Sequence, residues 1–375
     1  MKNKIHLLYC PGIYPCKTGG MEIYYYHLIA NIKKKFNNDN WIVMTSCKVL
    51  VDKHQNYISA KNKLFYTTRF GLGIFSSILC YLFSNKFKWR KIDNIIFPYT
   101  GNSYYNIAPI LLIKFLFKIP YTIHIHGGGM KSWRFASIQR YFFKHAKNIF
   151  GVSPSIIKEY KIRSNKNIKY LPPLLPLKRY NGNIEELKKE NNLSDFNKII
   201  LFVGSLKPLK SPDTLLKAFN HLGRDFIEEK KVCLLFIGDG PLLSDLIKYR
   251  KKNNLEKNVC FLGNVDNKYI SKYYLLSNIY VIPSWFEGTP ISLLEAKFNA
   301  MMCVGSNVKG INNVINNNVD GLLFDKNDNI QLSEILKDIL SSKIDSNQFG
   351  ENAKKEYEMK FNYSEHLKIL YESLQ

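Results

Sequence analysis

The chain has 375 residues, of which 46% are hydrophobic, 14% aromatic and 22% charged, and its formal net charge is +24. The length exceeds the roughly 250 to 300 residues at which a single hydrophobic core stops growing, so we expect two domains. The composition excludes a small disulfide scaffold and a largely disordered chain.

The excess positive charge lies entirely in the first half. Residues 1–180 contain 29 Lys and Arg against 5 Asp and Glu, whereas residues 181–375 contain 25 of each kind. Such asymmetry indicates different partners for the two halves, and nucleic acid and anionic membrane are the candidates for the basic one.

Three features bear on the cellular compartment. The seven cysteines are scattered without a Cys-x-x-Cys pair, which favours buried thiols in a reducing cytosol and no metal site. The apolar run before Pro11 has no cleavage pattern, so we interpret it as a strand rather than a signal peptide. The longest charge-free stretch, Ile95 to Ile113, is interrupted by Pro, Gly and Asn, which argues against a membrane-spanning helix.

Short apolar runs alternate with helix-length segments along the chain, as in parallel α/β sheets that are buried on both faces. The predicted strands of the first half are Ile5–Cys10, Ile42–Ser46, Ile95–Phe97, Tyr121–His126 and Ile149–Val152. Those of the second are Ile199–Gly204, Val232–Gly238, Val259–Leu262, Ile279–Pro283 and Met302–Gly305. The proline-rich stretch Tyr170 to Tyr180 is the expected linker. We therefore predict doubly wound domains over 1–175 and 176–355, and a C-terminal helix over 356–375 that can pack back on the first domain.

Three strand-to-helix turns have glycines that let a ligand approach the backbone. They contain Gly19-Gly20, Gly204 with Lys210 six residues later, and Gly238-Asp239-Gly240-Pro241. Free amides at the following helix starts suit an anion. Ordinary tight turns and a solvated lysine are the alternative, because neither a Walker loop nor GxGxxG occurs.

The segment from Ile282 to Ala296 has the strongest functional pattern. Glu287 lies on a loop with Gly288, and Glu295 lies eight residues later on the helix that Pro290 introduces. Both carboxylates can face the crevice at the carboxyl edge of the sheet, where open α/β sheets bind ligands. Carboxylates accept hydrogen bonds from vicinal hydroxyls, so this pair suits a hydroxyl-rich ligand.

Glu287 to Glu295 resembles the E-x7-E motif of the retaining family-4 glycosyltransferases of the GT-B fold. The flanking motifs occur in that family's order: VGxLxxxKxxxxLLxAF from Val203, GxGP from Gly238, FLGxV from Phe261 and NxxxGLLF from Asn317. The first half is similar more loosely, through Gly19-Gly20 and His124 to Gly127. The resemblance implies two Rossmann-like domains that face each other across a cleft.

The resemblance also implies roles for individual residues. Glu287 would hold the donor sugar hydroxyls, Glu295 the ribose, and Lys210 the diphosphate, with His126 near the transferred sugar and the base near 263–267. The catalytic set would be His126, Glu287 and Lys210. The donor-binding set would be Gly19, Gly20, Gly204, Ser205, Lys210, Gly238, Val265, Asn267, Glu287, Gly288, Thr289, Pro290, Ile291 and Glu295.

Three positions depart from the family pattern. Ser205 stands where many members have Arg, and Lys207 is the neighbour that can replace this cation. Asn267 stands where guanosine-using relatives can have Asp, which favours a uridine nucleotide. Ala300 stands where Gly is usual.

The reaction implied is transfer of a hexosyl or N-acetylhexosaminyl unit from a nucleotide-diphosphate sugar with retention. The sequence has no DxD triplet, so we expect neither a metal nor another cofactor, with Lys210 and helix amides stabilising the leaving diphosphate. The leaving phosphate would take the acceptor's proton, and Glu287 would position the sugar rather than act as a base.

The basic half would take the acceptor. Basic and aromatic residues alternate within 86–91, 110–119 and 131–147, which suits an anionic bilayer surface, although a solvated basic face is the alternative. Nucleic acid is disfavoured because no helix-turn-helix, RNP or zinc signature occurs. We expect a polyprenyl-diphosphate-linked glycan as acceptor, and a cytoplasmic protein peripheral on the inner face of the membrane.

Other functions stay open. An inverting GT-B transferase and a non-catalytic binder of nucleotide sugars or nucleic acid fit the same pattern. A nicotinamide-dependent oxidoreductase is disfavoured by the absence of GxGxxG.

Overall fold

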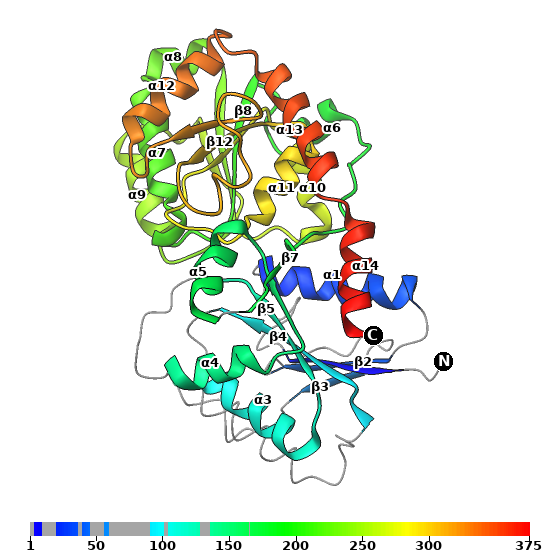
Figure 1. Cartoon of the computed structure of the whole chain (residues 1–375). Helices are drawn as coiled ribbons and strands as arrows, with labels where there is room; N and C mark the ends of the chain where they lie inside the picture. Colours follow the sequence, from blue (N-terminus) through cyan, green and yellow to red (C-terminus); the bar gives the residue numbers. More distant parts are fainter. Residues whose placement is uncertain are drawn as a thin grey trace. The chain divides into compact units, whose positions relative to one another are not determined.

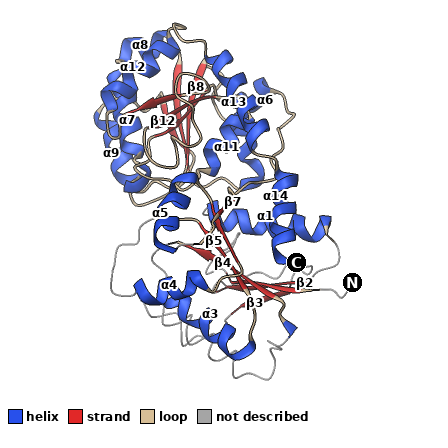
Figure 2. Ribbon diagram, viewed as in Figure 1, coloured by secondary structure: helices blue, strands red, loops and turns tan. Residues whose placement is uncertain are grey.

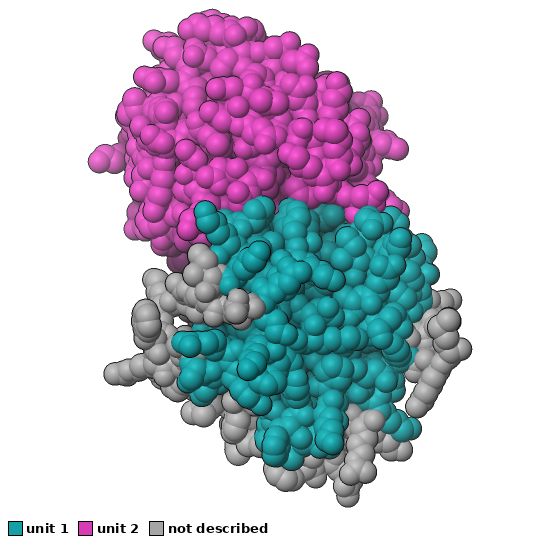
Figure 3. All heavy atoms as spheres, in the orientation of Figure 1, with its two compact units in different colours: residues 1–176, 363–375 teal, residues 177–362 magenta. Residues whose placement is uncertain are grey.

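The computed structural model describes residues 4–9, 20–36, 40–45, 56–59, 91–100, 104–127, 136–164 and 166–375. The chain divides into two compact units (Figure 3). Unit 1 comprises Met1–Pro176 together with Tyr363–Gln375, and unit 2 comprises Leu177–Asn362. Their boundary lies in the proline-rich stretch that the sequence indicates as the linker.

Unit 1 is built on a parallel sheet with the strand order β3-β2-β1-β4-β5-β6-β7. The strands β4 and β5 are buried along their whole length, as expected for short runs rich in Ile, Phe and Tyr. The bounds are β1 Ile5–Tyr9, β2 Asn40–Thr45, β3 Asn56–Ser59, β4 Asn94–Tyr99, β5 Tyr121–Ile125, β6 Asn148–Gly151 and β7 Lys169–Tyr170.

Helices cover both faces of this sheet. Figure 1 shows α3 and α4 on one side and α1 and α14 on the other. The ring of Phe36, just after α1, stacks on Tyr371 of α14 at 4.0 Å, and Asn148 of β6 donates to the carbonyl of Ser373 at 2.7 Å. The helices are α1 Gly20–Lys35, α3 Tyr104–Phe117, α4 Ala136–Lys144, α5 Pro154–Ser164 and α14 Tyr363–Leu374.

Unit 2 repeats the architecture with the order β10-β9-β8-β11-β12-β13. All its strand pairs are parallel, and its core joins the sheet to α7, α9 and α12. The bounds are β8 Lys198–Val203, β9 Val232–Ile237, β10 Val259–Phe261, β11 Ile279–Ile282, β12 Met302–Ser306 and β13 Leu322–Phe324.

The helices of unit 2 form two groups (Figures 1 and 2). The first group, α7, α9 and α12, lies on one side of the sheet, and α10, α11 and α13 lie on the other. The bounds are α6 Ile184–Glu190, α7 Pro212–His221, α8 Arg224–Glu229, α9 Leu243–Lys252, α10 Ile270–Leu276, α11 Ile291–Phe298, α12 Asn329–Leu340 and α13 Ser346–Lys360, with 3-10 turns η4 Pro208–Lys210 and η5 Asn267–Tyr269.

The predicted α/β class with two doubly wound sheets is confirmed. All ten predicted strands are present with small shifts at their ends, whereas β3, β7 and β13, of two to four residues, were not predicted. The single C-terminal helix over 356–375 is wrong. Phe361 leaves the helical conformation at φ −127° and ψ 69°, so α13 ends at Lys360 and α14 begins at Tyr363. The two helices belong to different units.

Among the helices of the described ranges, none has both the length and the apolar composition to cross a bilayer.

Candidate functional site

The candidate site of unit 2 lies where the winding of its sheet reverses. β8 and β11 are 79 residues apart in register at Ile200 and Ile279, yet they are neighbours in the sheet. The loops that leave their carboxyl ends are therefore brought together, which is where open α/β sheets bind ligands. The backbone joins them directly, because the amide of Trp285 donates to the carbonyl of Leu209 at 2.9 Å.

An ion pair connects the two loops. Lys210 Nζ lies 2.5 Å from Oε1 of Glu287, and the hydroxyl of Ser284 donates to the same oxygen at 2.7 Å. Only 8% of Glu287 is exposed, while 30% of the Lys210 side chain is. Among the described residues, none donates to Oε2 of Glu287. That oxygen and the remaining N–H groups of the ammonium can therefore bind a ligand that carries both hydroxyls and an anion.

A third loop, after β12, fixes the backbone beneath Glu287. Gly310 has φ +92°, and a Cβ there would lie 2.2 Å from the carbonyl oxygen of Glu287. Only glycine fits so close an approach in that conformation. The hydroxyl of Ser306 also donates to the carbonyl of Ser284 at 2.5 Å. Sequence reasoning missed Ser306 and Gly310 because their partners are distant in the chain, and it assigned no role to Ser284, although Glu287 is only three residues away.

The glycine turns after β8 and β9 pack against each other. Gly238 has φ +131°, and a Cβ there would lie 2.0 Å from the carbonyl oxygen of Gly204. A Cβ on Gly240 would lie 2.4 Å from the carbonyl oxygen of Leu206. Packing alone therefore requires glycine at 238 and 240, and ligand contact at Gly204 and Gly238 stays a prediction.

Glu295 has a different environment from Glu287, although both belong to one motif. It lies in the second turn of α11, only 7% exposed, and its Oε2 accepts a hydrogen bond from the hydroxyl of Tyr274 at 2.9 Å. Burial raises the pKa of Glu295 from 4.5 to about 7, and the Tyr274 hydrogen bond opposes this rise. A group poised near neutrality can switch between accepting and donating hydrogen bonds.

The other predicted donor-site residues of unit 2 lie on neighbouring loops. Pro290 caps α11, and the amides of Leu293 and Leu294 donate to its carbonyl at 3.1 and 3.2 Å, so the amide of Ile291 precedes the first intrahelical bond. Asn267 opens η5, and Lys207 is exposed on the loop after β8. Ser205, Val265, Gly288 and Thr289 lie on the loops that follow β8, β10 and β11, and their contact with a donor stays a prediction.

The predicted residues of the first half belong to unit 1. Gly20 is the first residue of α1, and Gly19 lies outside the described residues. His126 directly follows β5, and its Nε2 lies 2.8 Å from the hydroxyl of Tyr25. Burial holds the pKa of His126 well below 6.5, so the ring is neutral at neutral pH.

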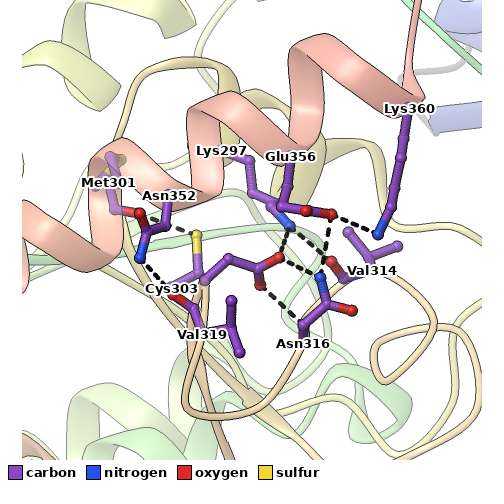
Figure 4. A network of polar contacts seen from close by, with 10 residues as sticks. Lys297, Met301, Cys303, Val314, Asn316, Val319, Asn352, Glu356 and Lys360 are labelled. Atoms are coloured by element: carbon purple, nitrogen blue, oxygen red, sulfur yellow. Dashed lines mark hydrogen bonds and ion pairs between the residues drawn. The ribbon is translucent and has the colours of Figure 1, made fainter.

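A buried ion pair holds α11, the helix that carries Glu295, through the side chain of Lys297 (Figure 4). Lys297 of α11 is 1% exposed and donates to Asp320 at 2.9 Å and to the carbonyl of Val314 at 2.7 Å. Asp320, fully buried, also accepts from the amide and the side chain of Asn316 at 2.9 and 2.7 Å. The Asn316 side chain reaches on to Glu356 of α13 at 3.2 Å. This network was not predicted, because one lysine in an apolar helix gives no sign of a buried partner.

The sequence and the fold of this chain are similar to those of known proteins. The family model of the glycosyl transferases group 1 matches residues 183–356. A GalNAc-alpha-(1->4)-GalNAc-alpha-(1->3)-diNAcBac-PP-undecaprenol alpha-1,4-N-acetyl-D-galactosaminyltransferase of Campylobacter jejuni is 31% identical over 278 residues, 71% of this chain and 72% of that protein. The chain belongs to the group 1 glycosyltransferases.

Two further similarities agree with this family. The N-acetyl-alpha-D-glucosaminyl L-malate synthase of Bacillus anthracis is 26% identical over 238 residues, which are 63% of this chain and 61% of that enzyme. The fold is similar to that of HepE of Anabaena, solved in complex with UDP and glucose, with a TM-score of 0.78 at 15% identity over 99% of both chains. The resemblance to GT-B family-4 enzymes and the assignment as a glycosyltransferase are thus confirmed.

The buried pair of this glycosyltransferase generates a stability prediction. Lys297→Met leaves the Asp320 charge buried and unpaired, and should lower the free energy of unfolding by about 3 to 5 kcal/mol. Adding Asp320→Asn removes the orphaned charge and should recover most of this loss. The exposed pair Lys217–Asp213 is the matched control, since Lys217→Met should cost about 1 kcal/mol or less. Equal losses for Lys297→Met and Lys217→Met in denaturant unfolding would contradict the argument.

The raised pKa of Glu295 generates a pH prediction. The folded glycosyltransferase keeps a proton on this carboxyl that the unfolded chain loses near pH 4.5. This group's contribution to stability is therefore complete below pH 4.5 and falls by about 3 kcal/mol as the pH rises through about 7. Glu295→Gln cannot ionise, so its stability relative to the unmodified enzyme should improve by about that amount between pH 4.5 and 8. Unfolding at both pH values measures it, and a constant difference would contradict the assignment.

Proposed function

We propose that this glycosyltransferase moves a hexosyl or N-acetylhexosaminyl unit from a UDP-sugar to a lipid-linked glycan, with retention and without a metal. The Lys210–Glu287 pair at the β8–β11 switch point carries the proposal. In a nucleotide sugar the anionic diphosphate is attached to the anomeric carbon, so a phosphate oxygen and the sugar hydroxyls lie close together. A cation and a carboxylate held 2.5 Å apart match that juxtaposition.

Lys210 would bind the diphosphate with the N–H groups that Glu287 does not use. The first amides of α11 add partial positive charge where the Glu287 loop ends. Charge on the leaving diphosphate would be stabilised by these preorganised groups, which is why we propose metal independence.

Glu287 would position the sugar instead of attacking it. Its Oε1 already accepts from Lys210 and Ser284, which fixes its orientation. Oε2 would accept from a donor-sugar hydroxyl, and the leaving phosphate would take the acceptor's proton on the same face. This assignment corresponds to retention of the anomeric configuration.

Different observations support the proposed uridine nucleotide and the proposed lipid-linked acceptor. Asn267 in place of Asp favours uridine over guanosine, and the fold neighbour HepE was solved with UDP and glucose. The name of the Campylobacter relative includes an undecaprenol diphosphate-linked glycan. A lipid-linked acceptor requires the enzyme to work at a membrane surface.

Unit 1 provides a surface that suits such a membrane. The end of α3 exposes 82% of Phe115 and 53% of Leu116, and α4 exposes Ile138 and Tyr141. Basic residues of the same two helices accompany them: Lys114, Arg140 and Lys144, with Lys118 just after α3. Apolar side chains can enter the bilayer interface while each cation adds about 1 kcal/mol at an anionic leaflet. The predicted basic and aromatic residues 86–90 and 131–135 lie outside the described residues.

A transfer assay tests the catalytic proposal. We expect transfer from a UDP-sugar of a panel to an undecaprenyl-diphosphate-linked saccharide in EDTA, with a retained anomeric configuration by NMR. Glu287→Gln and Lys210→Met should each lower kcat by about 10²- to 10³-fold, the loss typical of one preorganised electrostatic contact. Lys217→Met, on the exposed face of α7, is the control that should keep normal turnover. Normal turnover of Glu287→Gln would refute the role of Glu287 in positioning the sugar. A strict need for added metal would refute metal independence.

Vesicle flotation tests the membrane proposal. The enzyme should float with phosphatidylglycerol vesicles and not with phosphatidylcholine vesicles, and added salt should weaken this binding. Replacing Phe115 and Leu116 by Ser should reduce flotation, whereas the same change at Met359 and Val319 of unit 2, which are 70% and 52% exposed, should not. Equal binding to neutral and anionic vesicles would argue against the proposal.

A further inference from the structure

A tyrosine hydroxyl bridges two histidine rings beside the end of β5. The hydroxyl of Tyr25, on α1, lies 3.0 Å from Nδ1 of His124 and 2.8 Å from Nε2 of His126. The ring centroids of the two histidines are 4.3 Å apart. Tyr25 and His124 are buried, and His126 is half-buried. All three residues belong to unit 1.

The position of each proton in this chain of contacts follows from one carbonyl. Nε2 of His124 lies 2.9 Å from the carbonyl oxygen of Leu171, and a carbonyl can only accept, so Nε2 carries the hydrogen. In a neutral ring Nδ1 of His124 is then an acceptor, and the Tyr25 hydroxyl must donate its only hydrogen there. The hydroxyl oxygen can therefore only accept from His126, so Nε2 of His126 carries a hydrogen as well.

Both rings are neutral, as this assignment requires. Burial lowers the pKa of His124 from 6.5 to about 4, although the bond to Leu171 opposes the change. Burial and the neighbouring His124 hold the pKa of His126 well below 6.5. Among the ring nitrogens of His124 and His126, the one that keeps a lone pair outside this series of hydrogen bonds is consequently Nδ1 of His126.

We propose that Leu171, His124 and Tyr25 lock His126 in the Nε2–H tautomer, so that its Nδ1 presents a hydrogen-bond acceptor to the substrate. The proposal rests on the proposed function in placing His126 near the transferred sugar. His124 and Tyr25 are positioning residues, since they act through His126. A substrate at this point must contribute a hydrogen-bond donor such as a hydroxyl, and a group that can only accept is rejected.

The neighbouring tyrosine provides a matched control. Tyr24 is also fully buried on α1, and its hydroxyl lies 3.0 Å from Nε2 of His366 on α14. Tyr24→Phe and Tyr25→Phe thus each remove one buried hydroxyl from a histidine partner. Both should lower the melting temperature, but only Tyr25→Phe breaks the chain that ends at His126.

Tautomers are measured by long-range ¹⁵N–¹H correlation NMR of the full-length protein without substrate. The unmodified protein and Tyr24→Phe should show His126 protonated on Nε2. Tyr25→Phe leaves that Nε2–H without its acceptor and should shift His126 toward the Nδ1–H form. An Nδ1–H tautomer in the unmodified protein, or an unchanged His126 in Tyr25→Phe, would overturn the proposal.

Kinetics test the acceptor role. The side-chain amide of Asn lies about where Nδ1 of a histidine lies, so His126→Asn can keep a hydrogen-bond acceptor at that place. The amide of Gln lies about where Nε2 lies, so His126→Gln leaves no acceptor at the place of Nδ1. His126→Asn should therefore retain about tenfold more kcat than His126→Gln. Tyr25→Phe should lower kcat about tenfold with little change in the donor KM, while Tyr24→Phe should lower neither. Equal kcat for His126→Asn and His126→Gln, or normal kcat in Tyr25→Phe, would overturn the role. If no UDP-sugar is transferred at all, the proposed function fails, and the NMR result still decides the tautomer.

Discussion

The ion pair between Lys210 and Glu287 is the interaction on which the candidate site depends. It forms because the reversal of winding places β8 beside β11, so that loops 77 residues apart in sequence share one edge of the sheet. With Glu287 only 8% exposed, the pair lies in a medium where charges interact more strongly than in water. Each partner offsets the cost of burying the other. Gly310 lets the loop after β12 approach the carbonyl of Glu287, and the hydroxyls of Ser284 and Ser306 hold the Glu287 loop by hydrogen bonds.

A paired site of this kind is nearly neutral until a donor binds. In the proposed donor complex the diphosphate would bind the N–H groups of Lys210 that Glu287 leaves unused, and sugar hydroxyls would donate to the carboxylate of Glu287. Under that proposal unit 2 would need no basic surface to bind a nucleotide, which agrees with the equal numbers of acidic and basic residues in 181–375, the range that contains most of unit 2. The surplus of positive charge in residues 1–180 would then serve something other than the nucleotide, and the proposed membrane-bound acceptor would account for it together with the exposed apolar side chains of α3 and α4.

The sequence was sufficient for features that depend on local pattern. Apolar runs located ten strands because strands such as β4, β5, β9 and β12 are buried along their whole length, and the spacing of Glu287 and Glu295 located the motif. It was insufficient where a partner lies far along the chain. The pattern places Glu287 on a loop and Glu295 on a helix, but it does not show that Glu287 is paired to a cation and that Glu295 is buried against Tyr274. Tyr25 lies in a run of three tyrosines typical of a core helix, and its role emerges only from the two histidines that it contacts. The helix break at Phe361 was missed because apolar residues continue on both sides of it, from Met359 to Leu374, although Asn362 and Ser364 are poor residues for a helix interior.

The helix α11, which carries Glu295, shows why such distant contacts matter for the geometry of the candidate site. Residues two apart on an α-helix point about 200° apart around its axis. Glu295 and Lys297 accordingly project to opposite sides, one bonded to Tyr274 of α10 and the other to Asp320 and the carbonyl of Val314. The helix is therefore held from both sides by polar contacts that tolerate little sliding, because a displaced partner would leave a buried group unsatisfied. The start of α11 immediately follows the Glu287 loop, so this restraint also limits the motion of the loop. The buried lysine thus contributes to the geometry of the site without contacting a substrate.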